Sequence, residues 1–438
     1  MRVHLRMLGC RLNQSEIDMM ARQFQAQGHD IVDDPALADQ VVVNTCAVTQ
    51  DAVRSSRKLV RDLHTINADA AITVTGCYAQ IAPEDIAILP GVAGVVDNLA
   101  KDSLVETLTG QPVLPFEQEP LERGVHPGAS GRTRAFIKVQ DGCDNACTFC
   151  ITTVARGAGR SRSQDEIVAE IRYLHSIGYQ EAVLTGVHLG SYGHDRSDPD
   201  GLAGLVRAIL AETDIPRLRL SSLEPWDLAP SFFDLWDNPR LCRHLHLPLQ
   251  SGSDATLKRM LRRTTQVQFR ALVEAARARI PGVSITTDVI VGFPGETDAE
   301  FAESAAFIAE MDFAGLHVFR YSRRPGTAAA RMRGHIPKDV QKTRSAHLLA
   351  LASDMENRFA AQFAGETLPV LWEQIAGVQE EGFLNVGYTD NYIRVRCVHP
   401  RPLTNHILPA QVAGYDLATG QTQVTVHVKD LSPDQYGA

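Results

Sequence analysis

The sequence contains no long apolar run. No segment approaches the roughly 18 consecutive apolar residues that a membrane-spanning helix needs, and charged residues interrupt the N-terminal stretch before the apolar core of a signal peptide can form. The sequence also lacks a strong excess of either charge, because it has 43 Lys and Arg and 52 Asp and Glu. This balance argues against blanket electrostatic binding of nucleic acid but allows local basic patches. We therefore expect a cytoplasmic protein with no membrane partner.

Length and composition indicate a folded chain with several cores. The 438 residues predict about three domains, and a hydrophobic content of 44% argues against disordered and collagen-like classes. Nothing routes the chain to an oxidising compartment, and a chain of this length needs no disulfide staples. Its few cysteines therefore favour metal or redox chemistry, and they are Cys10, Cys46, Cys77, Cys143, Cys147, Cys150, Cys242 and Cys397.

The first hundred residues alternate strand-like and helix-like segments. Three apolar β-type runs end at Cys10, Cys46 and Cys77, each about one βαβ unit from the next. Right-handed crossovers would make these strands parallel, so the three thiols would emerge at one edge of one sheet, where open α/β sheets bind ligands. Asn13 and Glu16 have the spacing of a helix capping box.

These patterns predict an α/β protein of three parts. Residues 1–110 are expected to form a parallel α/β domain, and residues 111–130, rich in Pro, Gly and acidic groups, a linker. Six β/α units in residues 131–365 predict a partial (β/α)6 barrel with its chemistry at the strand C-termini. Residues 366–438 have short β-type runs split by Gly, Asn and Asp turns, which predict a small antiparallel β-barrel.

The strongest motif is the triplet Cys143-x3-Cys147-x2-Cys150, directly after the first predicted barrel strand. Three thiolates in this spacing can ligate three irons of a [4Fe-4S] cluster and leave the fourth open. An open iron can bind the amino and carboxylate groups of S-adenosylmethionine. The alternative is a three-cysteine zinc knuckle, because the paired C-x2-C elements of a zinc ribbon are absent.

This triplet in its context resembles the radical S-adenosylmethionine superfamily, and the whole chain is similar to the methylthiotransferase branch. The resemblance implies an N-terminal methylthiotransferase domain, a partial radical barrel and a C-terminal TRAM domain. It also implies that Cys10, Cys46 and Cys77 hold a second, auxiliary [4Fe-4S] cluster, although cysteines at strand ends are also common as small buried hydrophobes. The motifs that carry it are LGCRLNQSE, VVVNTCAVT, VTGCYAQ, DGCDNACTFCITTVARG, LPLQSGSDATLKRMLRR, TTDVIVGFPGET and GYTDNYIRV.

Polar and glycine residues at predicted strand ends are candidate ligands of S-adenosylmethionine. The segment GFPGET lacks the Lys and Ser/Thr of a phosphate-binding loop; by resemblance it lies against the adenosine portion, and a tight turn is the alternative. The candidate ligands are Thr185, Gly186, Glu224, Gln250, Ser251, Gly292, Gly295 and Arg320. His188 and His246 are expected to be hydrogen-bonded structural residues, and Cys242 and Cys397 to serve packing. Catalytic residues beyond the cluster ligands are not identified.

Several local runs of basic residues predict a groove for a phosphate backbone. Each run alone is typical of a solvated face, but the runs flank both cysteine sites. Residues 366–438 have four Arg and Lys against eight Asp and Glu, so RNA contact there would depend on Tyr388, Tyr392, Arg394 and Arg396. The basic runs lie in residues 54–61, 132–162, 258–263 and 323–344.

The resemblance implies methylthiolation of carbon 2 of a modified adenosine beside the tRNA anticodon. This carbon has no leaving group, so a radical route is chemically sensible, and a flipped-out base would have to reach both clusters. NTCAVT, GCRLNQSE and GYTDNYIRV are most similar to enzymes acting on N6-threonylcarbamoyladenosine. Isopentenyl-adenosine in tRNA and an aspartate of a ribosomal protein are alternative substrates, since residues 151–154 (ITTV) depart from the usual family pattern.

The expected partners are the tRNA anticodon stem-loop, a reductant such as flavodoxin or ferredoxin, and a sulfur donor. A different class is a non-catalytic iron–sulfur sensor that binds RNA and responds to redox state. Cleavage of S-adenosylmethionine would distinguish the enzyme from the sensor.

Overall fold

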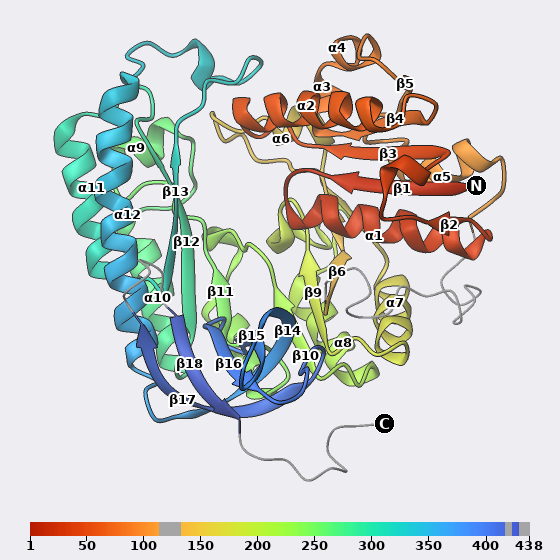
Figure 1. The fold of residues 1–438 in the computed structure, drawn as a ribbon. Coiled ribbons are helices and arrows are strands. Elements are labelled where there is room, and N and C mark those ends of the chain that lie inside the picture. The colour runs from red at the N-terminus through yellow and green to blue at the C-terminus, as the bar shows by residue number, and fades with distance from the viewer. Residues whose placement is uncertain (114–132, 417–422, 429–438) are drawn as a thin grey trace.

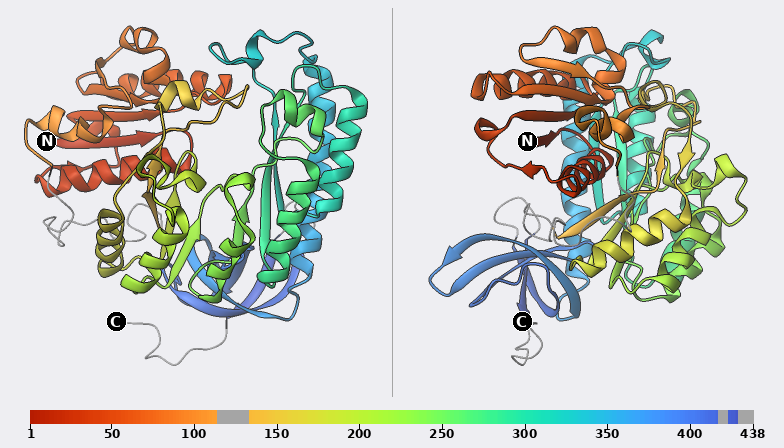
Figure 2. Two further views of the ribbon diagram at one scale, coloured as in Figure 1. Left: turned by 180° about the vertical axis from the view of Figure 1, so that it is seen from behind. Right: turned by 90° about the vertical axis from the view of Figure 1, so that its right-hand side faces the viewer.

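The computed structural model describes residues 1–113, 133–416 and 423–428, with side chains up to residue 413. Most of the predicted linker, and Arg132 in the second basic run, lie outside the described residues. Figure 1 shows an N-terminal α/β unit, a middle part of β/α units, and a group of C-terminal strands at the opposite end of the molecule. The right-hand view of Figure 2 shows the N-terminal unit and the C-terminal strands one above the other on the same side of the β/α units.

The N-terminal unit is a five-stranded parallel sheet of order β2-β1-β3-β4-β5. Alternate residues of β3 point to opposite faces of the sheet, and buried side chains pack against each face. Val42 packs with Met20 and Leu104 on one face, and Val41 and Val43 join a separate cluster on the other. The elements are β1 (Arg2–Met7), α1 (Arg11–Ala26), β2 (Asp30–Ile31), η1 (Pro35–Leu37), β3 (Gln40–Thr45), α2 (Gln50–Ile66), β4 (Ala71–Gly76), α3 (Cys77–Ile81), α4 (Pro83–Ala87), β5 (Val92–Val95), η2 (Lys101–Ser103) and α5 (Leu104–Thr109).

The middle part has six parallel strands in chain order, in two three-stranded sheets, β10-β9-β6 and β11-β12-β13. Isolated parallel bridges, Leu218 to Leu241 and Ser222 to His246, join the two sheets. The α/β class with parallel sheets is therefore confirmed. The strands are β6 (Arg134–Lys138), β9 (Glu181–Thr185), β10 (Arg217–Leu220), β11 (His244–His246), β12 (Ser284–Val291) and β13 (Gly315–Arg320), with a small pair β7 (Gln140–Asp141) and β8 (Arg160–Ser161).

Helices follow most of these strands and bury one face each against the sheets. One continuous core contains the inner residues of α7, α8, α10, α11 and α12 together with the strands. Thr265 and Thr297 form capping boxes with Gln268 and Glu300, which set where α10 and α11 begin. The helices are α6 (Thr152–Arg156), α7 (Gln164–Ser176), α8 (Gly201–Glu212), α9 (Asp254–Arg259), α10 (Gln266–Arg279), α11 (Asp298–Met311) and α12 (Lys338–Ala361), with 3-10 turns at Leu189–Ser191, His194–Arg196, Pro225–Asp227, Pro230–Asp237 and Ala329–Arg331.

The C-terminal strands close into a small barrel of order β14-β15-β16-β18-β17 around Trp372. Neighbouring strands are antiparallel, as predicted, except that β16 pairs with β18 in parallel. The strands are β14 (Thr367–Gln379), β15 (Gly382–Thr389), β16 (Arg394–His399), β17 (Ile407–Asp416) and β18 (Gln423–Val428).

The β15–β16 turn docks on the parallel strands of the middle part. Arg243 forms an ion pair with Asp390 of this turn, and Arg219 donates to the carbonyl oxygens of Thr389 and Asp390. Among the helices of the described residues, none is long and apolar enough to cross a membrane.

Candidate functional site

The structure places the first three cysteines at the carboxyl ends of three adjacent parallel strands. Cys10 follows β1 and precedes α1, Cys46 follows β3, and Cys77 begins α3 after β4. Burial, together with the neighbouring Cys77 and Cys10, raises the pKa of the Cys46 thiol to about 11. All three cysteines are free thiols. The edge predicted from the βαβ spacing therefore brings three sulfur donors together.

Two glycines let these strand ends approach one another. Gly9 has a φ of +118°, and a Cβ atom there would lie 2.9 Å from the Cys46 Cβ and 3.1 Å from the Cys46 Sγ. Gly76 has a φ of +99°, and its Cβ would lie 2.4 Å from the Asn44 Oδ1. A side chain at Gly9 would push against Cys46, and one at Gly76 against the end of β3, so both glycines allow the close approach that a cluster bound by all three cysteines needs.

The predicted helix start at Asn13 is wrong, because tertiary partners use both residues of the expected capping box. Helix α1 begins at Arg11, after Cys10, with no side-chain cap. The Asn13 amide donates to the carbonyl oxygens of Leu8, at 2.7 Å, and Thr45, at 3.2 Å, and so ties the Cys10 loop to the end of β3.

Glu16 is the centre of a buried ionic network beneath this cysteine site. Its carboxylate lies 2.8 Å from the Lys101 Nζ, 2.9 Å from an Arg156 nitrogen and 4.0 Å from the Lys138 Nζ. Although burial raises it, these three cations hold the pKa of Glu16 well below its usual range. Because Lys138 and Arg156 belong to the middle part, the network fastens the N-terminal sheet to the loop that carries the second cysteine group.

The second group, Cys143, Cys147 and Cys150, lies in the loop between β7 and α6. Each sulfur accepts an N–H group, from the backbone of Asn145 at 3.4 Å, a guanidinium nitrogen of Arg262 at 3.7 Å and the backbone of Thr152 at 3.4 Å. Hydrogen bonds to sulfur stabilise cluster-bound thiolates and tune the reduction potential. Three free thiols in one short loop, each with an N–H donor, fit a cluster with three protein ligands.

His188 contacts the cysteine loop. The sequence did not predict this contact. Its Nε2 lies 2.5 Å from the Asp227 Oδ2, and its Nδ1 lies 3.2 Å from the Asn145 side chain. Although burial favours the neutral imidazole, hydrogen bonds with Asp227 and Cys143 raise the pKa of His188 to about 10. His188 is thus hydrogen-bonded, as expected, and it also orders the cysteine loop.

The predicted ligands of S-adenosylmethionine fall into distinct surroundings. Glu224 forms an ion pair with Arg262 beside Cys147. Gln250 has a φ of +72° and pairs with β12 through Asp288, and Ser251 is buried beside it. Gly292 and Gly295 form a turn: Glu296 accepts the Gly292 N–H at 2.6 Å, and Gly295 N donates to the Gly334 carbonyl oxygen at 2.8 Å. Arg320 is exposed at the end of β13, and Thr185 and Gly186 line the central cavity.

The central cavity, about 640 Å³ in volume, lies between all three parts of the chain. This size suits a nucleobase with a substituent. Cys10 and Arg11 line it from the N-terminal unit, and Tyr388, Tyr392 and Arg394 from the β15–β16 segment. The parallel strands contribute Thr185, Gly186, Ser221, Ser222, His244, His246, Thr286 and His317.

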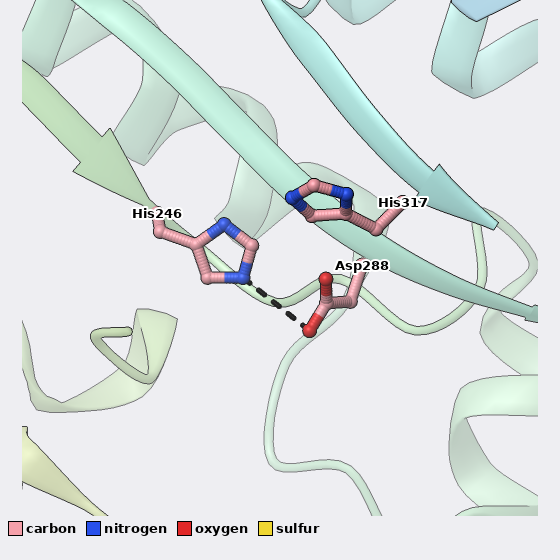
Figure 3. A group of neighbouring side chains, drawn as sticks. All are labelled: His246, Asp288 and His317. Atoms are coloured by element: carbon pink, nitrogen blue, oxygen red, sulfur yellow. Dashed lines mark ion pairs between the residues drawn. The ribbon is translucent and has the colours of Figure 1, made fainter. Parts of the chain in front are cut away.

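His246, Asp288 and His317 form a polar group on adjacent strands at this cavity (Figure 3). The His246 Nε2 lies 3.3 Å from the Asp288 Oδ2, and its Nδ1 lies 2.9 Å from the Thr286 Oγ1. One ligand atom from each of the three lies within 4.8 Å of the others. Two imidazoles and a carboxylate are a donor set that divalent metals use, and His246 is held in place by hydrogen bonds as expected.

Several residues of the basic runs are buried, so these side chains cannot contact a phosphate backbone in the predicted groove. Arg156 and Lys138 are buried in the Glu16 network, Arg262 pairs with Glu224, and Arg344 pairs with Glu296. Sequence alone could not show these partners, because they lie far away in the chain. In the described part of the chain, the basic residues of these runs that are exposed are Arg54, Lys58, Arg61, Arg160, Lys258, Arg263, Arg323, Arg331, Arg333, Lys338 and Lys342.

Cys242 and Cys397 lie apart from both cysteine groups. Cys242 is 2% exposed in the middle part, and Cys397 is 4% exposed in the core of the C-terminal barrel. Burial raises the pKa of both thiols, with a value of about 12 for Cys397. Both side chains are packed in the interior, as the sequence predicted.

Comparison with known proteins identifies two families along the chain. Residues 137–308 match the Radical SAM superfamily, and residues 2–97 match Uncharacterized protein family UPF0004. The fold resembles the radical S-adenosylmethionine methyltransferase TsrM from Kitasatospora setae, with a TM-score of 0.57, 17% identity, and coverage of 86% of this chain and 81% of that one. At this identity the likeness concerns the fold alone.

Curated relatives match over nearly the whole length. The threonylcarbamoyladenosine tRNA methylthiotransferase MtaB of Bacillus subtilis is 36% identical, over 96% of this chain and 98% of its own. The protein of the same name from Thermotoga maritima is 37% identical, with 90% of each chain covered. The tRNA-2-methylthio-N(6)-dimethylallyladenosine synthase of Geobacillus thermodenitrificans is 31% identical, over 93% of this chain and 80% of its own. The chain therefore belongs to the methylthiotransferase family of radical S-adenosylmethionine enzymes.

Proposed function

We propose that the protein methylthiolates carbon 2 of N6-threonylcarbamoyladenosine beside the tRNA anticodon, giving 2-methylthio-N6-threonylcarbamoyladenosine. The observation that carries this proposal is the convergence of Cys10, Cys46 and Cys77 at a sheet edge that opens into a base-sized cavity. Relatives that match over 84% to 96% of this chain bear the name of this activity. Its product forms by replacement of an aromatic C–H by C–S–CH3.

Each of the two cysteine groups would hold a different cluster. Cys143, Cys147 and Cys150 would hold the radical [4Fe-4S] cluster and its S-adenosylmethionine, and Cys10, Cys46 and Cys77 the auxiliary [4Fe-4S] cluster. When bound, these groups supply one-electron reduction, radical generation and a site for sulfur. The chain's own residues bind, orient and shield the base between them.

The cavity walls position the base. Burial lowers the pKa of His244 well below its usual value, so its imidazole is neutral, and its ring stacks at 4.6 Å on that of Tyr392. Ser221 and Ser222 at the end of β10, and Thr286 on β12, offer further polar groups. On the strand side, the cavity therefore offers a base neutral donors and acceptors, next to the β15–β16 turn.

The six parallel strands and the closed C-terminal barrel support a division of the chain into domains. We assign residues 1–110 to the methylthiotransferase domain, 111–130 to a linker, 131–365 to a partial radical barrel and 366–438 to a TRAM domain. Helix α5 ends at Thr109, α12 ends at Ala361 and β14 begins at Thr367, close to these boundaries.

The proposed partners include a cytoplasmic flavodoxin or ferredoxin as reductant and a separate sulfur donor.

Nucleoside analysis of tRNA from cells lacking the protein tests the substrate. We expect 2-methylthio-N6-threonylcarbamoyladenosine to disappear while N6-threonylcarbamoyladenosine accumulates. Loss of the methylthio derivative of isopentenyl-adenosine instead, with the threonylcarbamoyl nucleoside intact, would move the protein to the alternative substrate. Reduced, reconstituted protein should also release 5′-deoxyadenosine, which a non-catalytic sensor has no reason to do.

Iron analysis tests the two cysteine groups. Two four-iron clusters give about eight irons per chain, and Cys10→Ala or Cys143→Ala should each leave about four. Cys397→Ala is the matched control, because its thiol is buried in the C-terminal barrel away from both groups, and it should retain about eight irons. About four irons in the unaltered protein would remove the auxiliary cluster from the proposal.

A further inference from the structure

Arg11 occupies a particular place in the central cavity. It follows Cys10 directly, begins α1, and lines the cavity while its side chain is half-buried. Its guanidinium lies 5.7 Å from the centre of the Tyr392 ring and donates to the Tyr392 hydroxyl at 2.9 Å. A fixed cation therefore stands next to a ligand of the auxiliary cysteine site, on the wall that a bound base would face.

Three guanidiniums surround Tyr392, and two of them have a carboxylate partner. Arg219 lies 2.7 Å from the Glu181 carboxylate, and Arg134 forms an ion pair with Glu373. Within the described part of the chain, Arg11 forms no ion pair, and burial alone raises the pKa of Glu356, the carboxyl group that also lines the cavity. An Arg with five N–H donors, of which the Tyr392 hydroxyl engages one, keeps donors for an anion.

Tyr392 holds this cation in place. Its hydroxyl also accepts from Arg134 at 3.3 Å, and its ring is stacked between His244, at 4.6 Å, and Tyr388, at 4.9 Å. The backbone of Tyr392 has a φ of +68°, a conformation that the β15–β16 turn imposes. Because the ring is clamped, the hydroxyl gives Arg11 a fixed anchor, and less freedom is lost when an anion binds.

The charge of Arg11 lowers the pKa of two histidines that line the cavity. Burial lowers the pKa of His317, and Arg11 and His246 lower it further. The same cation contributes to the lowered pKa of His244, after burial and Arg219. The wall beside Cys10 is therefore electropositive and favours a ligand that brings negative charge.

We propose that Arg11 binds the carboxylate of the N6 substituent of the substrate base and so selects threonylcarbamoyl over isopentenyl groups. This inference rests on the proposed function. Carbon 2 and the carbon that bears N6 flank the same ring nitrogen of adenine, and Cys10 and Arg11 line the same cavity, so a base that presents carbon 2 at the Cys10 site can bring its N6 substituent to Arg11. An isopentenyl group would leave the Arg11 charge desolvated and unpaired, which penalises the wrong substrate as well as rewarding the right one.

The test compares four anticodon stem-loops bound to the reconstituted holoenzyme, by fluorescence anisotropy. The loops carry N6-threonylcarbamoyladenosine, the same nucleoside with its carboxylate converted to a carboxamide, isopentenyl-adenosine, or adenosine. We expect Arg11→Gln to weaken binding of the threonylcarbamoyl loop about 30-fold, as for a desolvated charge pair, with little change for the other three. Arg11→Lys should lose less, because it keeps a point charge.

Two controls accompany these variants. Arg172→Gln removes an exposed guanidinium that pairs with Glu212 on the far helices α7 and α8, and it should leave all four affinities unchanged. The unaltered holoenzyme should itself bind the carboxamide loop about 30-fold more weakly than the carboxylate loop. This second comparison stands even where Arg11→Gln folds poorly or loses iron, because it alters only the RNA.

Each outcome decides one claim. Equal weakening of all four loops by Arg11→Gln would assign the residue to a backbone phosphate and overturn the inference, and so would equal affinity of the unaltered protein for the carboxylate and carboxamide loops. Where the unaltered enzyme methylthiolates the threonylcarbamoyl loop in either case, the proposed function stands. Where it methylthiolates only the isopentenyl loop, the proposed function itself fails.

Discussion

The Glu16 network offers a quantitative test of how the N-terminal sheet is fastened to the middle part. The side chains of Glu16, Lys101 and Arg156 are 0%, 1% and 2% exposed, and Asn44 adds a hydrogen bond of 2.8 Å to the same carboxylate. Glu16→Gln keeps the shape but removes the charge. It leaves the almost fully buried Lys101 without its counter-ion, whereas Arg156 keeps the Asp141 carboxylate at 2.9 Å and Lys138, 4.0 Å from Glu16, keeps that of Asp102 at 2.8 Å.

The expected cost follows from the contact distances. At an effective dielectric constant of about 20, a charge pair separated by roughly 2.9 Å gains about 6 kcal/mol of Coulomb attraction. Desolvation of the buried ions offsets most of this gain, and removal of one partner from a buried pair costs about 3 to 5 kcal/mol net. For a cooperative unit of roughly 100 residues, about 4 °C of Tm corresponds to 1 kcal/mol. The N-terminal unit of Glu16→Gln should therefore melt roughly 12 to 20 °C lower.

Thermal melting followed by circular dichroism measures this shift. The matched control is Asp51→Asn, which breaks the pair with Arg54 on the surface of α2, where both side chains are more than 70% exposed; its Tm should not change. Adding Lys101→Met to Glu16→Gln should recover part of the loss, because one uncompensated cation is then gone. A Tm for Glu16→Gln equal to that of the Asp51 variant would refute the reasoning that this network fastens the two parts.

Two further predictions concern other parts of the molecule. Glu181, buried between Arg219 and Arg217, has a pKa lowered to about 2 by these cations despite its burial; its stabilising effect is complete above its unfolded pKa of about 4.3 and is lost as the pH falls through 2. Urea unfolding should show Glu181→Gln about 3 kcal/mol less stable at pH 7, with the difference from the unaltered protein shrinking at pH 3; a constant difference would contradict the assigned pKa. Gly9→Ala should lose about four irons, since its Cβ would meet Cys46 at 2.9 Å, whereas Gly110→Ala, also at positive φ but with nothing within 4 Å, should keep its iron; full iron in Gly9→Ala would show that the cysteine site tolerates separation of its strands.

The sequence predicted those features of the site that depend on local periodicity. The βαβ spacing placed Cys10, Cys46 and Cys77 at one sheet edge, and the structure has them after β1, β3 and β4, which are adjacent in the sheet. This inference succeeds because the handedness of crossovers leaves little choice once the strands are recognised. The triplet of Cys143, Cys147 and Cys150 was evident for a simpler reason, since its members are neighbours in the chain.

Features that depend on distant partners could not be predicted. Arg156 counted as a surface cation until the structure showed its bond to Glu16, 140 residues away. Asn13 and Glu16 have the spacing of a capping box, but tertiary hydrogen bonds engage both side chains. Charge runs and local spacing report what a residue is able to do, whereas burial decides which partner it uses.

The C-terminal barrel shows how this difference bears on function. From its composition, RNA contact there was expected to depend on Tyr388, Tyr392, Arg394 and Arg396. In the structure the Tyr392 ring stacks on His244 and the Tyr388 ring stacks on Tyr392, and both tyrosines line the substrate cavity. Arg219 and Arg243 bind the same turn, so the barrel is fixed to the strands rather than free to follow an RNA. The barrel thus completes the wall of the substrate cavity, and we expect the phosphate contacts of a bound tRNA to include exposed cations outside the barrel, such as Arg54, Lys58 and Arg61 on α2.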